Sequence, residues 1–110
     1  MTNRLFVYGS LAPGRQNAHI LAPLGGTWQP ATVRGRLRLD GWGAALGFPG
    51  LVLDPAGEEV NGQVFTADEL ANFWPELDEF EGAQYARVPV EAMLSGGDTV
   101  EAYVYVLSPG

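Results

Sequence analysis

The run from Thr99 to Leu107 constrains the fold most, because its residues alternate between two sets and neither set is plainly polar. One set is Val100, Ala102, Val104 and Val106, and the second set includes Tyr103, Tyr105 and Leu107. A period of two is typical of a β-strand, whose successive side chains point to opposite faces of the sheet. A strand with two largely apolar faces fits a closed or strongly curled sheet that encloses a cavity.

Several other short stretches are expected to be strands, and glycine and proline make the turns between them frequent. Residues 32–40 alternate between an apolar set and a set formed by Arg34, Arg36, Arg38 and Asp40. This pattern predicts a half-buried strand whose arginines either face water or bind an acidic substrate. The remaining expected strands are Leu5–Tyr8, Leu51–Leu53, Glu59–Phe65 and Tyr85–Glu91, with a hairpin turn at residues 95–98.

One principal helix is expected among these strands. Thr66 and Glu69 form a capping box, which predicts a helix that starts at Ala67. Its apolar stripe is expected at Leu70, Phe73, Trp74 and Leu77, with a kink at the residue before Pro75. The order of elements predicts an α+β fold, a small mixed β-barrel with one helix packed beside it. The 110 residues suffice for a single domain, 1–110, and are too few for two.

Charge and missing residue types exclude several classes of function. The formal net charge is -7 and all six basic residues are arginines, so we expect no nucleic-acid partner. The absence of lysine excludes Schiff-base chemistry, and the absence of cysteine excludes thiol catalysis and thiolate metal sites. His19 is the only histidine, so carboxylates alone could at most hold a hard cation such as Mg²⁺. The apolar run Leu5–Tyr8 is too short to span a membrane, and we expect a cytoplasmic enzyme or binding module.

An acidic residue on an apolar helical face is the first candidate functional group. Pro75–Phe80 is expected to form a short helix whose inward stripe is Leu77, Phe80 and Glu81, with Gly82 ending it. Desolvation and neighbouring acids should disfavour the ionised form of Glu81, which suits a proton shuttle near neutral pH. The alternative is that Glu81 is only a helix-end residue that faces water.

The loop Gly9–Gln16 is the second candidate. It directly follows the buried strand Leu5–Tyr8, but it lacks the GK[ST] ending of a phosphate loop and the GxGxxG pattern. A Gly-Ser-Leu turn in this position can point successive backbone N–H groups into a pocket, where they bind a carboxylate or an oxyanion. A tight turn with no further role is the alternative.

Two stretches far apart in the chain together resemble the gamma-glutamylcyclotransferase superfamily. VYGSLAPGRQNAHIL, residues 7–21, is similar to the family's opening, in which a strand ends in Tyr-Gly-Ser/Thr-Leu and an Asn follows. LDEFEGAQYAR, residues 77–87, is similar to its second signature, Leu-Asp-x-x-Glu-Gly followed by Tyr and Arg. GFPGLVL and VNGQVF resemble the intermediate strands, so the resemblance spans almost the whole chain. Short members such as this one most resemble the γ-glutamylamine branch, the avirulence-induced-gene-like proteins and their bacterial relatives.

The resemblance implies a β-barrel enzyme that cyclises a γ-glutamyl group to 5-oxoproline and releases the attached amine. Such an enzyme needs no metal or organic cofactor, and its partner is a small γ-glutamyl amide. By matching position, Glu81 is the general acid/base. The resemblance also implies that the glutamyl group is bound by the backbone of Tyr8, Gly9, Ser10 and Leu11. The Tyr85 hydroxyl is implied to orient the substrate or Glu81.

Two alternatives to this activity remain open at the level of the sequence. A serine hydrolase would use Ser10, His19 and Asp78, although Ser10 lacks the GxSxG elbow and a Pro/Gly-rich loop separates it from His19. A non-catalytic protein of the same fold would bind a γ-glutamyl compound or another small acidic ligand.

Overall fold

The computed structural model describes residues 3–8, 20–38, 50–82 and 85–107, without the side chains of residues 37, 38, 50, 81 and 107. The strands are β1 (Arg4–Val7), β2 (Thr27–Arg38), β3 (Gly50–Leu53), β4 (Glu58–Thr66), β5 (Tyr85–Leu94) and β6 (Thr99–Leu107). The helical segments are the 3₁₀ helices η2 (Ala22–Leu24) and η4 (Asp68–Asn72) and the α-helix α1 (Trp74–Glu81). Each strand expected from the sequence is present, and β2 begins earlier than expected.

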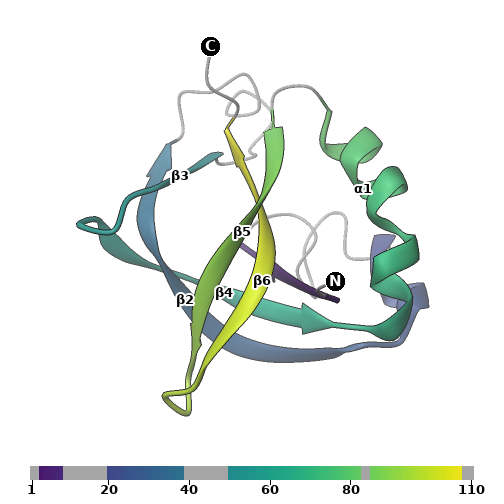
Figure 1. Cartoon of the computed structure of the whole chain (residues 1–110), viewed down its shortest axis with the longest axis horizontal. Helices are drawn as coiled ribbons and strands as arrows, with labels where there is room; N and C mark the ends of the chain where they lie inside the picture. Colours follow the sequence, from purple (N-terminus) through teal and green to yellow (C-terminus); the bar gives the residue numbers. More distant parts are fainter. Residues whose placement is uncertain (1–2, 9–19, 39–49, 83–84, 108–110) are drawn as a thin grey trace.

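The strands close into a barrel (Figure 1). Their hydrogen-bonded order is β3-β2-β4-β1-β6-β5, and β2 also pairs with β5, with Ala31 opposite Leu94 and Thr32 opposite Met93. This additional pairing joins the ends of the order β2-β4-β1-β6-β5, so five strands form a closed barrel and β3 extends from β2. β1 and β6 run parallel, whereas the other described pairs are antiparallel. The expected α+β fold, a small mixed β-barrel with one principal helix, is confirmed.

The barrel encloses a packed apolar core. Phe6, Val64 and Val104 come from three neighbouring strands, and each is at most 1% exposed. Gly62 of β4 lies against β1, because a Cβ atom there would be 2.5 Å from the carbonyl oxygen of Val7 and 2.6 Å from the Phe6 ring. The other buried members of this core are Ala31, Val33, Leu51, Val60 and Ala92.

A second apolar core lies between the outer surface of the barrel and the helical segments. In Figure 1, α1 stands beside the barrel. Leu70 of η4 and Trp74 and Leu77 of α1 are buried in this layer. From the barrel and the β4–η4 connection come Leu5, Val7, Phe65, Ala67 and Tyr105, and Leu21 also belongs to this layer. The two apolar faces of β6 are thus confirmed, since one face fills the barrel and the other is covered by the helices.

The helical segment differs from the sequence expectation in two respects. Thr66 ends β4, where it pairs with Thr27 of β2, and Ala67 is extended with φ −152° and ψ 137°. The expected capping box is therefore wrong, because the sheet holds Thr66, and the chain forms η4 before α1 begins at Trp74. The expectation that Phe80 faces inward is also wrong, since Phe80 is 42% exposed.

The described arginines of β2 face outward, as expected for a solvated sheet face. Arg34 and Arg36 are exposed. Arg34 Nη1 donates to the carbonyl oxygen of Gly57 at 3.3 Å, and Arg36 Nη2 lies 3.4 Å from Asp54 Oδ2.

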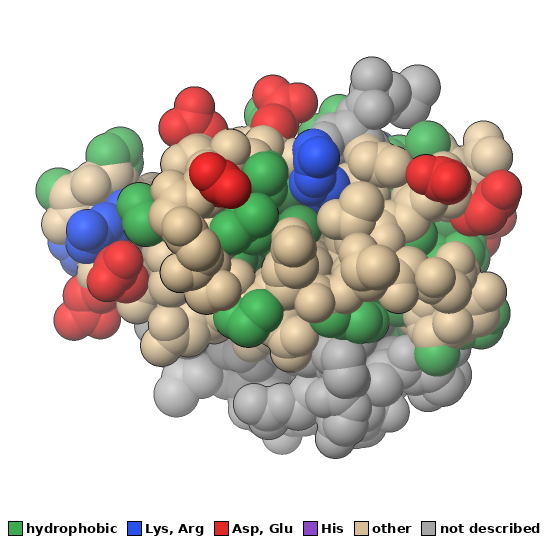
Figure 2. Space-filling view, turned by 90° about the horizontal axis from the view of Figure 1, so that it is seen from below, with side chains coloured by type: hydrophobic (Ala, Val, Ile, Leu, Met, Phe, Trp, Pro, Cys, Tyr) green, Lys and Arg blue, Asp and Glu red, His purple; other side chains and the backbone are tan. Residues whose placement is uncertain are grey.

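Figure 2 shows that acidic side chains are scattered over the face seen there, with hydrophobic groups between them. The described residues of that face therefore form no continuous charged surface.

Candidate functional site

Four chain segments meet at one end of the barrel. The N–H of Gly82 donates to the carbonyl oxygen of Asp78 at 3.0 Å, and the N–H of Tyr85 donates to that of Gly82 at 3.2 Å. The end of α1 therefore leads directly into β5, whose first residue pairs with Leu107 at the end of β6 (Figure 1). Since β1 runs parallel to β6, it ends on the same side. Val7 and Tyr8, which open the first stretch that resembles a cyclotransferase signature, thus lie at the same end of the barrel as the end of α1 and the start of β5, which belong to the second.

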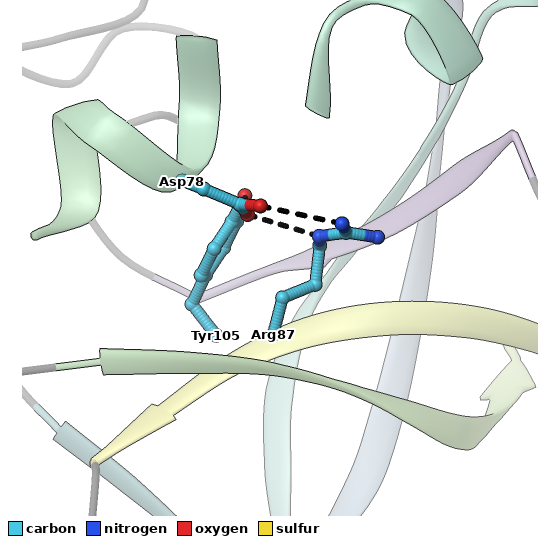
Figure 3. Close-up of polar contacts among 3 residues, drawn as sticks. All are labelled: Asp78, Arg87 and Tyr105. Carbon is cyan, nitrogen blue, oxygen red and sulfur yellow. Dashed lines mark hydrogen bonds and ion pairs between the residues drawn. The ribbon is translucent and has the colours of Figure 1, made fainter. Parts of the chain in front are cut away.

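Asp78, Arg87 and Tyr105 form a hydrogen-bonded cluster between α1 and the barrel (Figure 3). Arg87 donates to both carboxylate oxygens of Asp78, from Nε to Oδ1 at 2.9 Å and from Nη2 to Oδ2 at 3.3 Å. The Tyr105 hydroxyl donates to Asp78 Oδ1 at 2.6 Å. Arg87 and Tyr105 are cross-strand partners, so two neighbouring strands hold one residue of the helix.

Two aromatic rings fix the guanidinium group of Arg87. Its Cζ atom lies 4.6 Å from the ring centroid of Trp74 and 4.6 Å from that of Tyr103, within the range of a cation–π contact. The two rings meet edge to face, with their centroids 5.1 Å apart. The side chains of Arg87 and Asp78 are 23% and 45% exposed, so the ion pair is partly solvated while the rings set its orientation.

The cluster is charged at neutral pH. The hydrogen bonds from Arg87 lower the pKa of Asp78 below its usual 3.8; burial opposes this effect, and the Tyr105 hydroxyl adds to it. Burial works against the charge of Arg87, but the hydrogen bonds and the charge of Asp78 raise the Arg87 pKa above its ordinary value. Asp78 is therefore a carboxylate acceptor rather than a proton donor in this arrangement.

The stability of the protein should depend on the charge of Asp78. Its pKa is lowered on folding, so its ionised form contributes stability above pH 3.8, and this contribution is lost as the pH falls through the lower folded value. We expect Asp78→Asn to lower the free energy of unfolding by on the order of 0.5–1 kcal/mol near neutral pH, because the pair is partly solvated. Urea unfolding measured from pH 7 to pH 2 should show this difference shrinking below pH 3.8. The matched control is Glu76→Gln, an exposed acid of the same helix; a constant difference for Asp78→Asn would contradict the assignment.

Tyr8 ties the end of β1 to two other strands. Its hydroxyl donates to the carbonyl oxygen of Tyr105 at 2.5 Å and accepts the N–H of Leu51 at 3.2 Å. The Tyr8 ring packs on the barrel core and stacks on Phe6, with the ring centroids 6.3 Å apart. Tyr8, the residue before the predicted Gly-Ser-Leu turn, is therefore anchored to β6 and β3 through its side chain.

The predicted site residues are only partly within the described chain. Gly9, Ser10 and Leu11 lie outside it, and for Glu81 the structure describes the backbone, as the last residue of α1, but not the side chain. Tyr8 has the contacts given above. Tyr85 opens β5 and packs, partly buried, against the layer beneath α1. The roles expected for these six residues stay predictions.

Sequence reasoning gave no role to Arg87 or Tyr105 and considered Asp78 only as the acid of the serine-hydrolase alternative. The available signal was the second signature itself, since Asp78 and Arg87 both lie in the stretch 77–87. Tyr105 had no comparable signal, because its partner is 27 residues earlier in the chain.

The structure also bears on the alternatives. Asp78, the acid of the serine-hydrolase alternative, already accepts hydrogen bonds from Arg87 and Tyr105, while Ser10 and His19 lie outside the described residues.

Among the described side chains, no group of three or more His, Cys, Asp or Glu could hold a metal ion. None of the helices in the described ranges has the length and apolar character required to cross a membrane.

Solved structures place the fold among those of AIG2-like and γ-glutamyl cyclotransferase proteins. An AIG2-like protein from Mus musculus superposes with a TM-score of 0.75 at 24% identity, over 96% of this chain and 77% of that one. YkqA from Bacillus subtilis matches with a TM-score of 0.74 at 30% identity, and this chain is 98% covered but spans only 36% of YkqA. A protein described as γ-glutamyl cyclotransferase gives a TM-score of 0.72 at 19% identity, over 98% of this chain and 68% of that one.

The family follows from the sequence comparison. Residues 5–110 match the family described as "Gamma-glutamyl cyclotransferase, AIG2-like". The chain belongs to this family, which confirms the resemblance noted from its two signatures. A search of curated proteins finds no match.

Proposed function

We propose that this protein is a cyclotransferase that converts a γ-glutamyl amide, either a γ-glutamylamine or a γ-glutamyl amino acid, into 5-oxoproline and the free amine. Glu81 acts as the general acid/base. The backbone of Tyr8, Gly9, Ser10 and Leu11 holds the glutamyl group, and the Tyr85 hydroxyl orients the substrate or Glu81. Membership of the family supports the reaction class.

The observation that supports the proposal is that α1 and β1 end at the same end of the barrel. Position 81 follows Trp74, Leu77 and Asp78 by seven, four and three residues, which puts all four positions on one side of the helix. The side chains of Trp74 and Leu77 pack in the apolar layer against the barrel, and the Asp78 side chain is hydrogen-bonded to Tyr105 of β6. Position 81 thus comes last on the barrel-facing side of α1, at the end of the barrel where β1 also ends.

The reaction needs proton transfer and positioning, and one carboxylate can supply the first. The substrate's α-ammonium group loses a proton, and the resulting amine attacks the γ-carbonyl carbon of the same molecule, forming the ring C–N bond. Collapse of the tetrahedral intermediate breaks the C–N bond to the departing amine. Glu81 takes the proton from the α-amine and gives it to the departing nitrogen, a role worth about 10² to 10⁴ in rate.

Positioning comes from the pocket. Ring closure requires the γ-glutamyl chain to fold back on itself, and a pocket that holds this shape can reach effective molarities of about 10⁵ M or more. Backbone N–H groups of the Gly-Ser-Leu turn would bind the substrate carboxylate or the developing oxyanion.

A panel of γ-glutamyl compounds tests the proposal. We expect 5-oxoproline and one equivalent of free amine from at least one of γ-glutamylamines, γ-glutamyl amino acids and the γ-glutamyl derivative of a lysine side chain. The α-glutamyl isomers are the matched control, because their amide is at the wrong carbonyl for the same ring closure. Calorimetric binding without 5-oxoproline from any member of the panel would instead favour the non-catalytic ligand-binding alternative.

A further inference from the structure

Tyr105 is the one described residue that is hydrogen-bonded both to α1 and to the residue that follows β1. Its hydroxyl donates to Asp78 of the helix at 2.6 Å, and its carbonyl oxygen accepts the Tyr8 hydroxyl at 2.5 Å. Tyr105 is 4% exposed, so both contacts are made by a residue that is buried in the packed layer. A single residue of β6 is therefore hydrogen-bonded to both segments.

On the helix side, Asp78 connects the hydrogen bond from the Tyr105 hydroxyl to position 81. Asp78 lies three residues before Glu81, and its carbonyl oxygen accepts the N–H of Gly82, which closes the last helical turn. Its carboxylate is held by Tyr105 and Arg87. The barrel thus fixes the last turn of α1 by way of the Asp78 side chain.

On the strand side, Tyr8 connects its hydrogen bond with the Tyr105 carbonyl oxygen to the predicted Gly-Ser-Leu turn. Tyr8 immediately precedes residues 9–11, whose backbone is assigned to the glutamyl group in the proposed function. Its hydroxyl is shared between Tyr105 and the N–H of Leu51, so the end of β1 is held from two strands.

We propose that Tyr105 is a positioning residue for the ring-closure reaction: it holds the end of α1, with Glu81, at a fixed place relative to the turn that begins at Tyr8. The inference rests on the proposed function for its catalytic consequence, whereas its structural part stands on the two hydrogen bonds alone. Tyr105 acts through Asp78 and Tyr8 and need not touch the substrate.

The test is Tyr105→Phe, which removes the hydroxyl and keeps the ring and the carbonyl oxygen. A general acid/base displaced by a fraction of an ångström loses rate steeply, so we expect kcat to fall about 10- to 100-fold while KM changes less than about threefold. Tyr103→Phe is the matched control. Tyr103 precedes Tyr105 by two residues on the same face of β6, and its hydroxyl makes no hydrogen bond to a described residue, so its removal should change kcat less than about twofold.

Amide hydrogen exchange gives a second readout that needs no activity. We expect Tyr105→Phe to speed exchange of the Gly82 amide about tenfold or more, while the Val64 amide in β4 keeps its protection. Faster Gly82 exchange with unchanged kcat, or no change in either, would overturn the positioning role. If the wild-type protein releases no 5-oxoproline from any compound, the proposed function fails, and Gly82 exchange still decides whether Tyr105 holds the helix end.

A second variant covers the case in which Tyr105→Phe does not fold. Asp78→Ala removes the acceptor of the same hydrogen bond from a side chain that is 45% exposed, so it opens no cavity in the core. The same fall in kcat and the same faster Gly82 exchange are expected, and an Asp78→Ala protein with wild-type kcat would contradict the inference.

Discussion

Glu81→Gln should abolish measurable 5-oxoproline formation while leaving the fold intact. Glutamine keeps the size of the side chain but cannot take the proton from the α-amine, so we expect kcat/KM to fall by about 10² to 10⁴. The position is the last residue of α1, where a glutamine is compatible with the helix. The measurement is 5-oxoproline release from the best compound of the panel, with circular dichroism and thermal unfolding to check the fold.

The matched control for this variant is Glu79→Gln. Glu79 is exposed on the same helix, two residues before Glu81, and should show wild-type turnover. Unchanged turnover in Glu81→Gln would remove Glu81 from the mechanism. An equal loss in both variants would point to the charge of the helix rather than to one general acid/base.

Leu77→Ala should be the most destabilising of the variants considered. Leu77 is 0% exposed and packs in the layer that joins α1 to the barrel. Loss of its buried methyl groups and the cavity that remains should lower the free energy of unfolding by about 2–5 kcal/mol, measured by urea unfolding. This variant tests whether packing of this layer, rather than the intrinsic stability of an eight-residue helix, holds α1 in place.

Phe80→Ala is the comparison for Leu77→Ala on the same helix. Phe80 is 42% exposed, so its truncation should change the free energy of unfolding by less than about 0.5–1 kcal/mol. A loss as large as that of Leu77→Ala would mean that Phe80, and not the face with Trp74 and Leu77, is packed against the protein in solution.

The strands could be predicted because alternation is a local property of the sequence. Val104 and Tyr105 are adjacent in β6, and their opposite environments, the barrel interior and the layer beneath α1, follow from a period of two. The pairing that closes the barrel could not be predicted in this way, because it joins residues far apart in the sequence. Ala31 meets Leu94 across most of the chain length, and the two apolar faces of β6 indicated closure without identifying β2 and β5 as the strands that complete it.

The inward face of α1 could be predicted only in part. A stripe through Trp74 and Leu77 can include either Phe80, three residues after Leu77, or Asp78, four residues after Trp74, and the apolar phenylalanine is the choice that the hydrophobic pattern favours. The protein instead turns Asp78 toward the barrel, because Arg87 and Tyr105 satisfy its carboxylate there. Such partners come from other strands, so local pattern does not reveal them.

The place of β1 in the sheet imposes an order on biosynthesis. β1 precedes the other described strands in the chain, yet it lies between β4 and β6, and its partner across the parallel pair, Tyr103, is synthesised only after β2, β3, β4 and β5. A nascent chain on the ribosome can dock β1 against β4 but leaves its other edge open until β6 emerges. During that interval the incomplete barrel has an unpaired strand edge, with which another extended segment could pair. The barrel therefore closes only after β6 has been synthesised.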